Sequence, residues 1–504
     1  MLAIALFYMF CIVLISKSAI QQRIPSKTTM PQPTQESDDF AWKRPAPTAA
    51  SGGLNPSEKD RQRPLPKLPL TRLPGWPTEF PENLTEHREQ VLQRHWPTLH
   101  DKHVAEIAPF VWHHRGIAEE LQEKAQSPDR EESEWAYREM ARLGVVPYYG
   151  ERANASFVVL IRNRELDEFR TSMRQLEDRF NRKYHYPYLF LNDEPFSDEF
   201  MQMVAASTTS NVTFALIPRD HWSLPDFIDE QRAERARKQM AANNVIYGGS
   251  LSYRHMCRFN SGFFYKHPLL RNVDWYWRVE PGVDFYCDID YDPFKYMAEN
   301  GKLYSFVIAL KELEATVPTL WEHTLKYMKE RNVTSELLQY FVGRTGNYNL
   351  CHFWSNFEIA SLNWLRTPEY QSYFEYLDQA QGFFMERWGD APVHSLAAGL
   401  LLRRDQVHFF DDIAYRHAEI THCPDTTSSV ELGLKCQCPL GVDNFDNHSD
   451  SCLPAWKSYE PNTWSLKDTE EALRLMRLRK IRFMNQEPRI VADRRRWYDV
   501  FAGI

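Results

Sequence analysis

The sequence predicts an α/β protein whose single large domain has a mixed, mostly parallel central sheet flanked by helices. Buried-strand runs alternate with helical stripes from residue 154 onward, which is the order that builds parallel sheets. Hydrophobic residues make up 43% and aromatic residues 14% of the 504-residue chain, enough to bury a large core. These observations exclude the disordered and fibrous classes of protein.

The first strands and helix of this alternation follow from the spacing of apolar residues. Residues 156–162 (Ser-Phe-Val-Val-Leu-Ile-Arg) form the continuous apolar run of a buried strand, and residues 188–191 and 212–217 repeat the pattern. Between the first two strands, a helical stripe is formed by Leu166, Phe169, Met173, Leu176 and Phe180. Ligands of such sheets bind beyond the carboxyl ends of the strands, where we expect Arg162. The chain has no GxGxxG or Walker motif, which disfavours NAD and ATP as ligands.

The N-terminal residues predict a membrane anchor followed by a stem. Residues 1–16 are almost wholly apolar, and as a helix they would span about 24 Å, slightly less than a hydrocarbon core of about 30 Å. A cleaved signal peptide is the alternative, but the basic start of such a peptide is missing. We therefore expect an uncleaved anchor over residues 1–20. Residues 21–81 are rich in Pro, Gln, Ser and Thr, a composition typical of an extended stem.

Charge and cysteine content narrow the class of protein further. The net charge is −8 and most of the excess acid lies after the stem, so no nucleic-acid partner is expected. Among the eight cysteines, Cys436 and Cys438 have C-x-C spacing and no paired histidines follow, which disfavours a zinc finger. We instead expect disulfides in the C-terminal cluster and at least one free thiol, as in an oxidising lumen. Five N-x-S/T sequons are compatible with that compartment.

Residues 274–292 hold the densest set of chemical groups in the sequence. A strand-like run ends at Glu280, and Pro281-Gly282 then forces a turn. The turn is followed by four more carboxylates, those of Asp284, Asp288, Asp290 and Asp292. Clustered carboxylates suit a hard divalent cation such as Mg²⁺ or Mn²⁺ that bridges a diphosphate. A solvated acidic turn without a ligand is the alternative explanation.

Other segments add cations and aromatic walls. Residues 253–258 (Tyr-Arg-His-Met-Cys-Arg) supply the positive charge that an acidic protein needs to bind a diphosphate. Residues 351–358 (Cys-His-Phe-Trp-Ser-Asn-Phe-Glu) place a carboxylate among aromatic rings, a combination that suits a sugar. A core carboxylate paired with an arginine is equally compatible with this segment. The lone histidines in residues 389–394 and 411–417 are, by themselves, expected to be structural.

Five sequence blocks resemble the fungal Golgi α-1,2-mannosyltransferases, glycosyltransferase family 15 of the Kre, Mnt and Ktr type. They are Tyr253-Arg-His-Met-Cys-Arg-Phe, Arg278-Val-Glu-Pro-Gly-Val-Asp, His352-Phe-Trp-Ser-Asn-Phe-Glu-Ile, Glu386-Arg-Trp-Gly-Asp-Ala-Pro-Val-His-Ser and Tyr415-Arg-His. The blocks keep the family's order, and the resemblance extends from about residue 150 to 455. It implies a GT-A-like, Rossmann-like fold and a retaining transferase that uses GDP-mannose and Mn²⁺. The implied acceptor is the 2-hydroxyl of a mannose on N- or O-linked glycans.

The resemblance also implies a location in the cell. Members of the family are type II proteins of the Golgi membrane, with a stem and a lumenal catalytic domain. This agrees with the anchor and stem expected independently from residues 1–81. The basic cytoplasmic tail typical of the family is missing before the apolar run.

The resemblance changes which residues are expected to bind the metal. Glu280 resembles the family's carboxylate on the metal side, and His417 resembles the second protein ligand of Mn²⁺. Asp288 and Asp290, which composition alone would select, are therefore not expected to be the main ligands.

Catalytic and donor-binding roles follow from the same blocks. Glu358 resembles the carboxylate proposed either as nucleophile or as the base or stabiliser on the sugar face. Tyr253 resembles a tyrosine close to the donor diphosphate and the acceptor. Donor binding is expected from Arg162, Arg258 and Asp390.

These expectations divide the chain into an anchor (1–20), a Pro-rich stem (21–81), a GT-A-like catalytic domain (82–455) and a C-terminal helical extension (456–504). Within the extension, residues 465–485 have the pattern of a helix with Ser and Asp near its start and basic residues later. Packing on the body and lying on a membrane surface are both open for this helix, and we expect packing.

Two other functions are weighed against the transferase. A catalytically inactive lumenal mannan-binding lectin or scaffold on the same fold would keep the aromatic walls but lose a metal ligand or Glu358, and the sequence retains all of them. A glycoside hydrolase would use two carboxylates, but the cations expected to bind a diphosphate argue against it.

Overall fold

The computed structural model describes residues 102–431, 433–439 and 444–485. The predicted anchor (1–20) and stem (21–81) lie outside these residues. Within the described part of the chain, no helix has the length and apolar character needed to cross a membrane.

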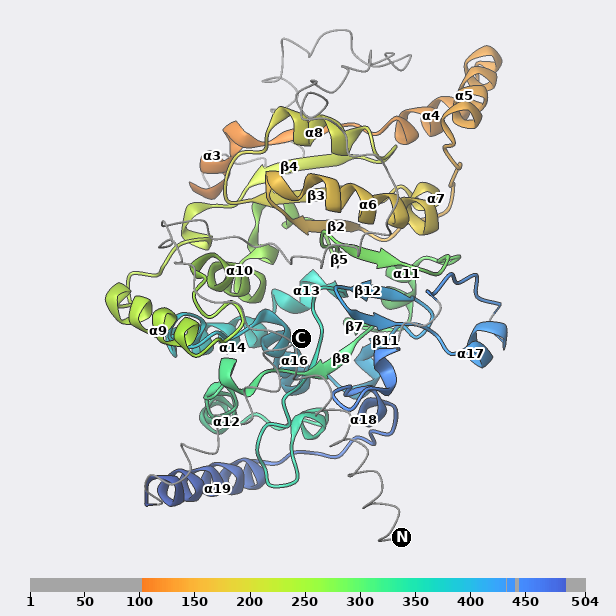
Figure 1. The fold of residues 1–504 in the computed structure, drawn as a ribbon. Coiled ribbons are helices and arrows are strands. Elements are labelled where there is room, and N and C mark those ends of the chain that lie inside the picture. Colours follow the sequence, from red (N-terminus) through yellow and green to blue (C-terminus); the bar gives the residue numbers. More distant parts are fainter. Residues whose placement is uncertain (1–101, 432, 440–443, 486–504) are drawn as a thin grey trace, which may run out of the picture. The chain divides into compact units, whose positions relative to one another are not determined.

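An eight-stranded sheet forms the centre of the fold, in the order β1-β4-β3-β2-β5-β10-β7-β11 (Figure 1). Its strands are β1 (Trp112–His114), β2 (Ala155–Leu160), β3 (Tyr188–Asn192), β4 (Val212–Leu216), β5 (Trp275–Arg278), β7 (Tyr304–Phe306), β10 (Glu358–Ser361) and β11 (Val407–Phe409). The pairs β2–β3, β3–β4, β2–β5 and β7–β11 are parallel, whereas β1 and β10 run antiparallel to their neighbours. The predicted mixed, mostly parallel sheet is confirmed.

The predicted order of strands and helices is also confirmed. Helix α6 (Leu166–Leu176) connects β2 to β3, and α8 (Asp198–Ala205) connects β3 to β4. The stripe side chains of Phe169, Met173 and Leu176 are fully buried against the sheet. After α6 the helical path continues as a π-helical segment, Glu177–Asn181, which carries the stripe on to Phe180.

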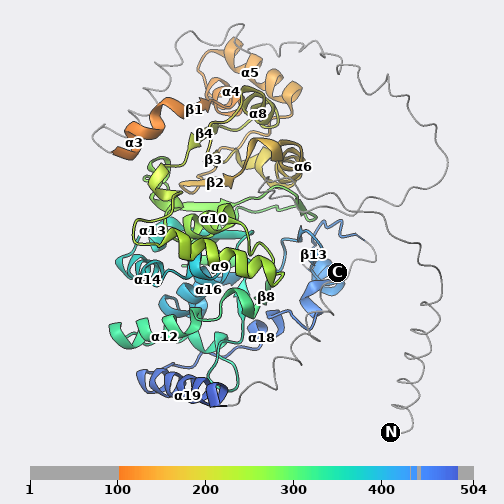
Figure 2. The same ribbon diagram turned by 60° about the vertical axis from the view of Figure 1, so that its left-hand side comes forward.

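Helices cover both faces of the sheet (Figures 1 and 2). Because side chains alternate along a strand, Phe157 and Val159 of β2 join the core under α6 and α8, while Val158 joins the core on the opposite face. That opposite core also contains residues of α10 (Leu251–Gly262), α14 (Pro368–Gln379) and α16 (Asp390–Leu401). Further helices are α3 (Lys102–Ile107), α4 (Ile117–Ala125), α5 (Arg130–Leu143), α7 (Arg182–Tyr184), α9 (Glu230–Ala242), α11 (Pro293–Glu299), α12 (Leu320–Arg331), α13 (Leu362–Leu365), α15 (Gly382–Met385), α17 (Thr426–Glu431) and α18 (Leu453–Lys457).

Two small sheets lie beside the central one. Strand β12 (Tyr415–His417) pairs antiparallel with both β6 (Val283–Phe285) and β13 (Ile420–His422). Strands β8 (Ala309–Lys311) and β9 (Cys351–Phe353) form the other antiparallel pair. The pairing of β12 with β6 brings residues 415–417 beside the strand that follows the turn after β5.

Three disulfides join segments far apart in the sequence. They are Cys287–Cys436, Cys351–Cys452 and Cys423–Cys438. Among the described residues, Cys257 is a free and buried cysteine. The expected disulfides and free thiol are therefore confirmed, and Cys436 and Cys438 belong to two different bridges.

The C-terminal helix α19 (Leu466–Asn485) packs on α12, as we expected (Figure 1). The Asp468 side chain accepts the Ser465 backbone N–H at 2.8 Å, which satisfies a donor at the helix start. Ala472 and Leu473 are buried, and Lys329 of α12 forms an ion pair with Glu470 at 3.0 Å.

Candidate functional site

The turn after β5 carries the first group of charges. The strand ends at Arg278, and Glu280 lies two residues later, directly before Pro281-Gly282. Gly282 has a φ of +73°, a conformation that costs glycine little and other residues more. The tight turn leads into β6 and keeps Glu280 beside the end of β5.

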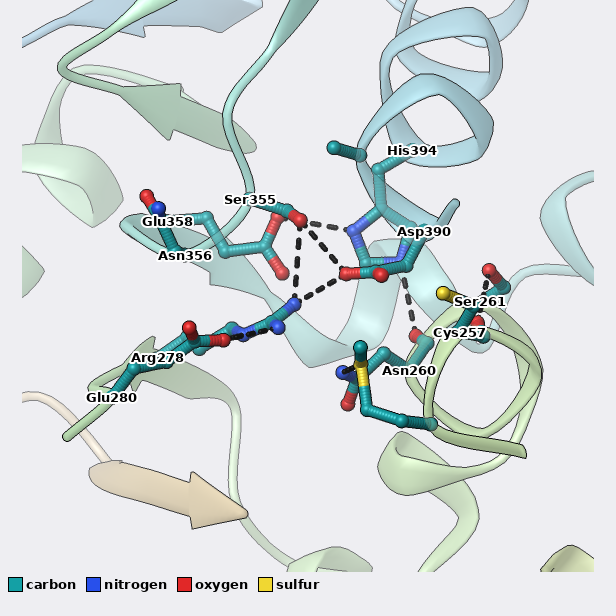
Figure 3. Close-up of polar contacts among 12 residues, drawn as sticks. Cys257, Asn260, Ser261, Arg278, Glu280, Ser355, Asn356, Glu358, Asp390 and His394 are labelled. Carbon is teal, nitrogen blue, oxygen red and sulfur yellow. Dashed lines mark hydrogen bonds and ion pairs between the residues drawn. The ribbon is translucent and has the colours of Figure 1, made fainter. Parts of the chain in front are cut away.

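Arg278 joins two carboxylates that lie 110 residues apart in sequence (Figure 3). Its guanidinium donates to Glu280 Oε1 and to Asp390 Oδ2, and it lies 3.3 Å from Ser355 Oγ. Burial alone would lower the pKa of Arg278, but Glu280 and Asp390 outweigh burial and raise this pKa well above its usual value. Arg278 is therefore a permanent cation that orients both carboxylates.

Asp390 is the first residue of α16 and is buried, with 4% exposure. Ser355 Oγ donates to Asp390 Oδ2 at 2.7 Å. Burial alone would raise the pKa of Asp390, but Arg278 and His394 overcome it and lower the pKa below its usual value. The N-terminus of a helix also favours a negative side chain. Asp390 is thus an ionised carboxylate held in one orientation.

Three side-chain hydrogen-bond donors surround the carboxylate of Glu358. Strand β10 runs antiparallel to β5, and its register places Glu358 opposite Arg278. Tyr276 donates to Oε1 at 2.5 Å, Tyr304 donates to Oε2 at 2.8 Å, and His394 Nδ1 lies 3.0 Å from Oε2. Glu358 is 1% exposed, so hydrogen bonds to these three side chains replace the hydrogen bonds to water that its carboxylate would make in solution.

His394 links Glu358 to helix α10, a function that its lone histidine motif did not predict (Figure 3). It lies one helical turn after Asp390, and its Nε2 is 3.0 Å from the backbone oxygen of Asn260. Both ring nitrogens face oxygen acceptors, so both carry protons. Burial alone would lower the pKa of His394, but Glu358 overrides it and raises the pKa. The pair is a buried imidazolium and carboxylate.

Glu280 and His417 come together because β12 pairs with β6. His417 lies opposite Val283, and its Nδ1 is 4.0 Å from Glu280 Oε2. The ring of Trp354 stacks on His417 at 5.3 Å, and the Asn356 amide nitrogen contacts His417 Nδ1. Burial lowers the pKa of His417, so the imidazole is neutral at pH 7, which is the form that binds metals.

The residues around this pair fit a divalent cation. Arg278 occupies mainly Oε1 of Glu280, which leaves Oε2 directed toward the imidazole of His417. Asn356 Oδ1 is buried and has no hydrogen-bond partner among the residues that the structure describes. A carboxylate, an imidazole and an amide oxygen are ligand types that Mn²⁺ accepts.

The aspartates of the acidic turn have partners of their own. Asp288 pairs with Arg179 at 2.8 Å, and Asp290 pairs with Lys435 at 3.2 Å. Asp292 caps the start of α11 by accepting two backbone N–H groups. Each of these aspartates therefore has a partner within the fold, and the expectation that Asp288 and Asp290 are not the main metal ligands stays a prediction.

Tyr253 lies on α10 between an aromatic ring and a cation. Ser250 caps the helix by accepting the backbone N–H of Tyr253 at 3.1 Å. The rings of Tyr247 and Tyr253 are stacked at 4.4 Å, and the Arg387 guanidinium lies 5.1 Å from the Tyr253 ring centroid. Burial raises the pKa of Tyr253 well above its usual value, so its hydroxyl stays protonated.

The two predicted donor-binding arginines lie in different surroundings. Arg162 donates a side-chain hydrogen bond to Ser252, the neighbour of Tyr253 on α10, so it reaches the same helix. Arg258 instead makes a buried bidentate ion pair with Asp378, at 2.7 and 2.8 Å. A diphosphate would have to compete with Asp378 for Arg258. The donor-binding role of each arginine stays a prediction.

Several side chains of this site were not predicted from the sequence. Arg278 and Arg387 lay inside the quoted motifs, yet Arg278, which is partly buried, and Arg387, which is buried, each lie next to a predicted residue, which spacing cannot reveal. For His394, the four-residue spacing from Asp390 was a usable signal, since such residues share one face of a helix. For Tyr276 and Tyr304 the sequence offers no comparable signal, because only the sheet register directs them at Glu358.

Comparison with known proteins identifies the family to which this chain belongs. The family model described as glycolipid 2-alpha-mannosyltransferase matches residues 113–461. The alpha-1,2 mannosyltransferase KTR1 of Saccharomyces cerevisiae is 50% identical over 316 residues, covering 62% of this chain and 80% of the relative. The glycolipid 2-alpha-mannosyltransferase of the same organism is 47% identical, covering 60% of this chain and 70% of the relative.

Solved structures show the same similarity in three dimensions. The Mn/GDP form of core-mannan synthase A from Aspergillus fumigatus is 36% identical, with a TM-score of 0.56, covering 64% of this chain and 86% of that one. The GDP complex of the S. cerevisiae mannosyltransferase Ktr4p is 31% identical, with a TM-score of 0.58, covering 71% and 99%. The chain described here belongs to the glycolipid 2-alpha-mannosyltransferase family and is a glycosyltransferase.

Proposed function

We propose that this protein is a retaining α-1,2-mannosyltransferase that transfers mannose from GDP-mannose to the 2-hydroxyl of a mannose at the end of a glycan. The acceptors are N- or O-linked glycans of secretory glycoproteins, and the reaction requires Mn²⁺. The observation that carries this proposal is two charge groups, Glu280–Arg278–Asp390 and His394–Glu358, which the register of β10 on β5 places side by side in a member of a mannosyltransferase family.

Glu280 and His417 would hold the Mn²⁺ ion. When bound, Mn²⁺ supplies positive charge against the diphosphate of the donor and of the departing GDP. The two side chains are supported by Arg278, which orients Glu280, and by the indole of Trp354, which stacks on His417. This support keeps the ligands in place without the donor, so little reorganisation is needed during the reaction.

The donor diphosphate would lie between Glu280 and α10. Tyr253 keeps its hydroxyl proton and can donate it in a hydrogen bond to a phosphate oxygen or an acceptor hydroxyl. Arg162, which bonds to Ser252 beside Tyr253, adds a cation at the carboxyl end of β2. Arg258 would join the donor only by giving up Asp378.

Glu358 would stabilise the positive charge that develops on the anomeric carbon of the mannose. Its oxygens accept hydrogen bonds from two tyrosines and from His394, which spread its negative charge. A carboxylate with three donors is a weaker nucleophile than a free one, which favours electrostatic stabilisation over a covalent intermediate. Front-face attack, with the leaving phosphate as base, is then the route to retention.

The test of the proposed function is transfer from GDP-mannose to α-methyl mannoside, with and without Mn²⁺, followed by determination of the product linkage. We expect an α-1,2 product that depends on Mn²⁺. Glu280→Gln and His417→Ala should each abolish the response to Mn²⁺. An enzyme whose His417→Ala variant keeps the parent's Mn²⁺ dependence would contradict the metal assignment. Absence of transfer to any simple mannoside, with retained mannan binding, would support the lectin instead.

A second measurement distinguishes whether Glu358 acts as a nucleophile or as an electrostatic stabiliser. A Glu358→Ala variant supplied with azide forms a β-mannosyl azide if Glu358 is the nucleophile, because azide then enters from the face that Glu358 leaves open. We expect no such product. Its appearance would establish the covalent route and overturn the stabilising role.

We also propose that residues 1–20 anchor the protein in the Golgi membrane as a single-pass type II protein, with residues 21–81 as the stem. The disulfides of the described residues support an oxidising lumen for the catalytic domain. Protease protection of the intact domain in sealed Golgi vesicles, lost on adding detergent, is the expected result. Digestion without detergent would contradict this topology.

A further inference from the structure

A second group of metal-binding side chains lies where α3 meets the segment after β4. Asp220 and His221 belong to the short 3-10 helix Arg219–His221, and His103 belongs to α3. One ligand atom from each of these three side chains lies within 4.8 Å of the others. None of the three belongs to the mannosyltransferase site described above.

His221 is the unusual member of this group. It is 5% exposed, and within the described residues its Nδ1 has no hydrogen-bond partner. Its Nε2 faces Asp220 Oδ1 at 4.0 Å, too far for a hydrogen bond. A buried imidazole nitrogen without a hydrogen bond is unfavourable, and an ion bound by this ring would give the imidazole a polar partner in the cluster.

The spacing of the donors suits a tetrahedral ion. His103 Nε2 is 2.9 Å from Asp220 Oδ1, and the rings of His103 and His221 are 4.5 Å apart between centroids. In a tetrahedral zinc site with bonds of about 2.0–2.1 Å, ligand atoms are separated by about 3.3–3.4 Å. The two separations from Asp220 Oδ1, 2.9 and 4.0 Å, lie on either side of that value, and all three ligand atoms lie within 4.8 Å of one another, so small side-chain shifts would bring them onto one ion.

We propose that His103, Asp220 and His221 form a binding site for Zn²⁺ or a similar divalent transition metal. Two imidazoles and one carboxylate are the ligand types of many zinc sites, and the fourth position remains for water or another donor. Lys102, which contacts Asp220 Oδ2 at 2.7 Å, is 76% exposed and can turn into solvent when the ion binds.

The site would fasten α3 to the central sheet. It adds to an existing contact, since Glu106 of α3 accepts the backbone N–H of Arg219 at 2.8 Å. The site thus lies on α3 (Lys102–Ile107), the first helix of the described residues. Its effect is therefore structural, and transfer activity is not expected to need it.

A second His and Asp cluster, Asp411, His422 and Asp446, is a weaker candidate. There the imidazole is already paired: Nδ1 lies 2.8 Å from Asp446 Oδ2, and Nε2 lies 3.3 Å from the backbone oxygen of Asp411. Both ring nitrogens have partners, so no ion is needed to satisfy them. This cluster serves as an internal control.

The test is metal content and affinity measured on the full-length protein. To remove the predicted Mn²⁺ site, the parent carries Glu280→Gln and His417→Ala. After dialysis against Zn²⁺ and then buffer, we expect about one zinc per chain by mass spectrometry, and a tetrahedral visible spectrum when Co²⁺ replaces it. Loss of a direct ligand should weaken Zn²⁺ binding by more than the about 10–100-fold that loss of an outer partner causes.

Two ligand variants and two controls, His448→Ala and Asp446→Asn, complete the design. His103→Ala and Asp220→Asn alter the more exposed ligands, so they test the site even if His221→Ala fails to fold. His448→Ala removes a surface histidine that lies beside Asp450 but belongs to no three-residue metal cluster among the described residues. This variant should bind as much zinc as the parent. The expected result is that zinc, the Co²⁺ spectrum and the rise in Tm with Zn²⁺ are lost only in the ligand variants.

Three outcomes would overturn the proposal. Equal zinc content in the parent and in His103→Ala would show that the ion, if bound, lies elsewhere. Loss of zinc in Asp446→Asn, with retention in Asp220→Asn, would move the site to the other cluster. Zinc content at background in the parent would show that the three side chains bind no ion.

Discussion

Replacing Glu358 by glutamine tests whether the buried charge network serves both stability and catalysis. The substitution keeps the shape of the side chain but removes the charge that faces His394 at 3.0 Å. Breaking a buried ion pair costs about 3–5 kcal/mol. The hydroxyls of Tyr276 and Tyr304 can reorient toward an amide, so we expect the lower end, about 3 kcal/mol. For a body of about 380 residues, this corresponds to a fall in Tm of about 4 °C.

The same variant should lose transfer activity. Removal of one preorganised electrostatic contact at a reacting centre typically lowers kcat by about 100-fold or more. The assays are thermal unfolding by calorimetry and the initial rate of mannose transfer under saturating GDP-mannose and Mn²⁺. The result expected is a lower Tm together with a lower kcat.

Glu177 provides a matched control for this measurement. It is a buried glutamate that accepts hydrogen bonds from Tyr188 at 2.7 Å and from Asn181 at 3.0 Å, and it begins the π-helical segment that follows α6. Glu177→Gln should alter Tm without lowering kcat of the folded enzyme. Near-normal turnover by Glu358→Gln would refute the catalytic reasoning, and an unchanged Tm would refute the assignment of a buried ion pair.

Three further predictions concern stability. Gly262→Ala should destabilise the protein by about 2 kcal/mol or more, measured by urea unfolding, because the added Cβ would lie 2.0 Å from the Phe374 ring. Cys351→Ser should lower stability by about 2–5 kcal/mol, since the Cys351–Cys452 bridge closes a loop of 101 residues, and an unchanged unfolding midpoint would contradict this. The pKa of Asp390 is lower in the folded protein than in the unfolded chain, so its ionised form stabilises the folded state at pH values above the unfolded-state pKa. The free energy of unfolding should therefore fall as the pH drops through the folded-state pKa of Asp390. Asp390→Asn should remove this contribution to the loss of stability in acid.

The fold was largely accessible from the sequence because its signals are local. The apolar run before Arg162 and the stripe on α6 arise from burial and helical periodicity within a few residues, so β2, α6 and β3 lie where they were expected. The exact ends differ by one or two residues, as for β2, which ends at Leu160: the backbone N–H of Ile161 makes a last bond to Leu191, and Arg162 then precedes the 3-10 turn Asn163–Glu165.

The site was accessible only through its motifs, and only in part. Motifs nominated Glu280, His417 and Glu358, but nothing in the spacing indicated that Arg278 orients Glu280 or that two tyrosines and His394 surround Glu358. The tyrosine contacts depend on the antiparallel registers of β10 on β5 and on β7, and the contact of His394 depends on the packing of α16, so they join residues far apart in the sequence. A register is determined by the packing of whole elements, which no short window of sequence contains.

The sequence by itself determined the class of fold, the expectation of an oxidising compartment and the motifs of a mannosyltransferase family. Only the tertiary structure decided which charges are paired. In the folded chain Arg258 pairs with Asp378, and Asp288 pairs with Arg179. His221 lies near Asp220 and His103. The physical reason is that local periodicity depends on neighbours along the chain, whereas the pairing of a charge depends on what folding brings within a few ångströms of it.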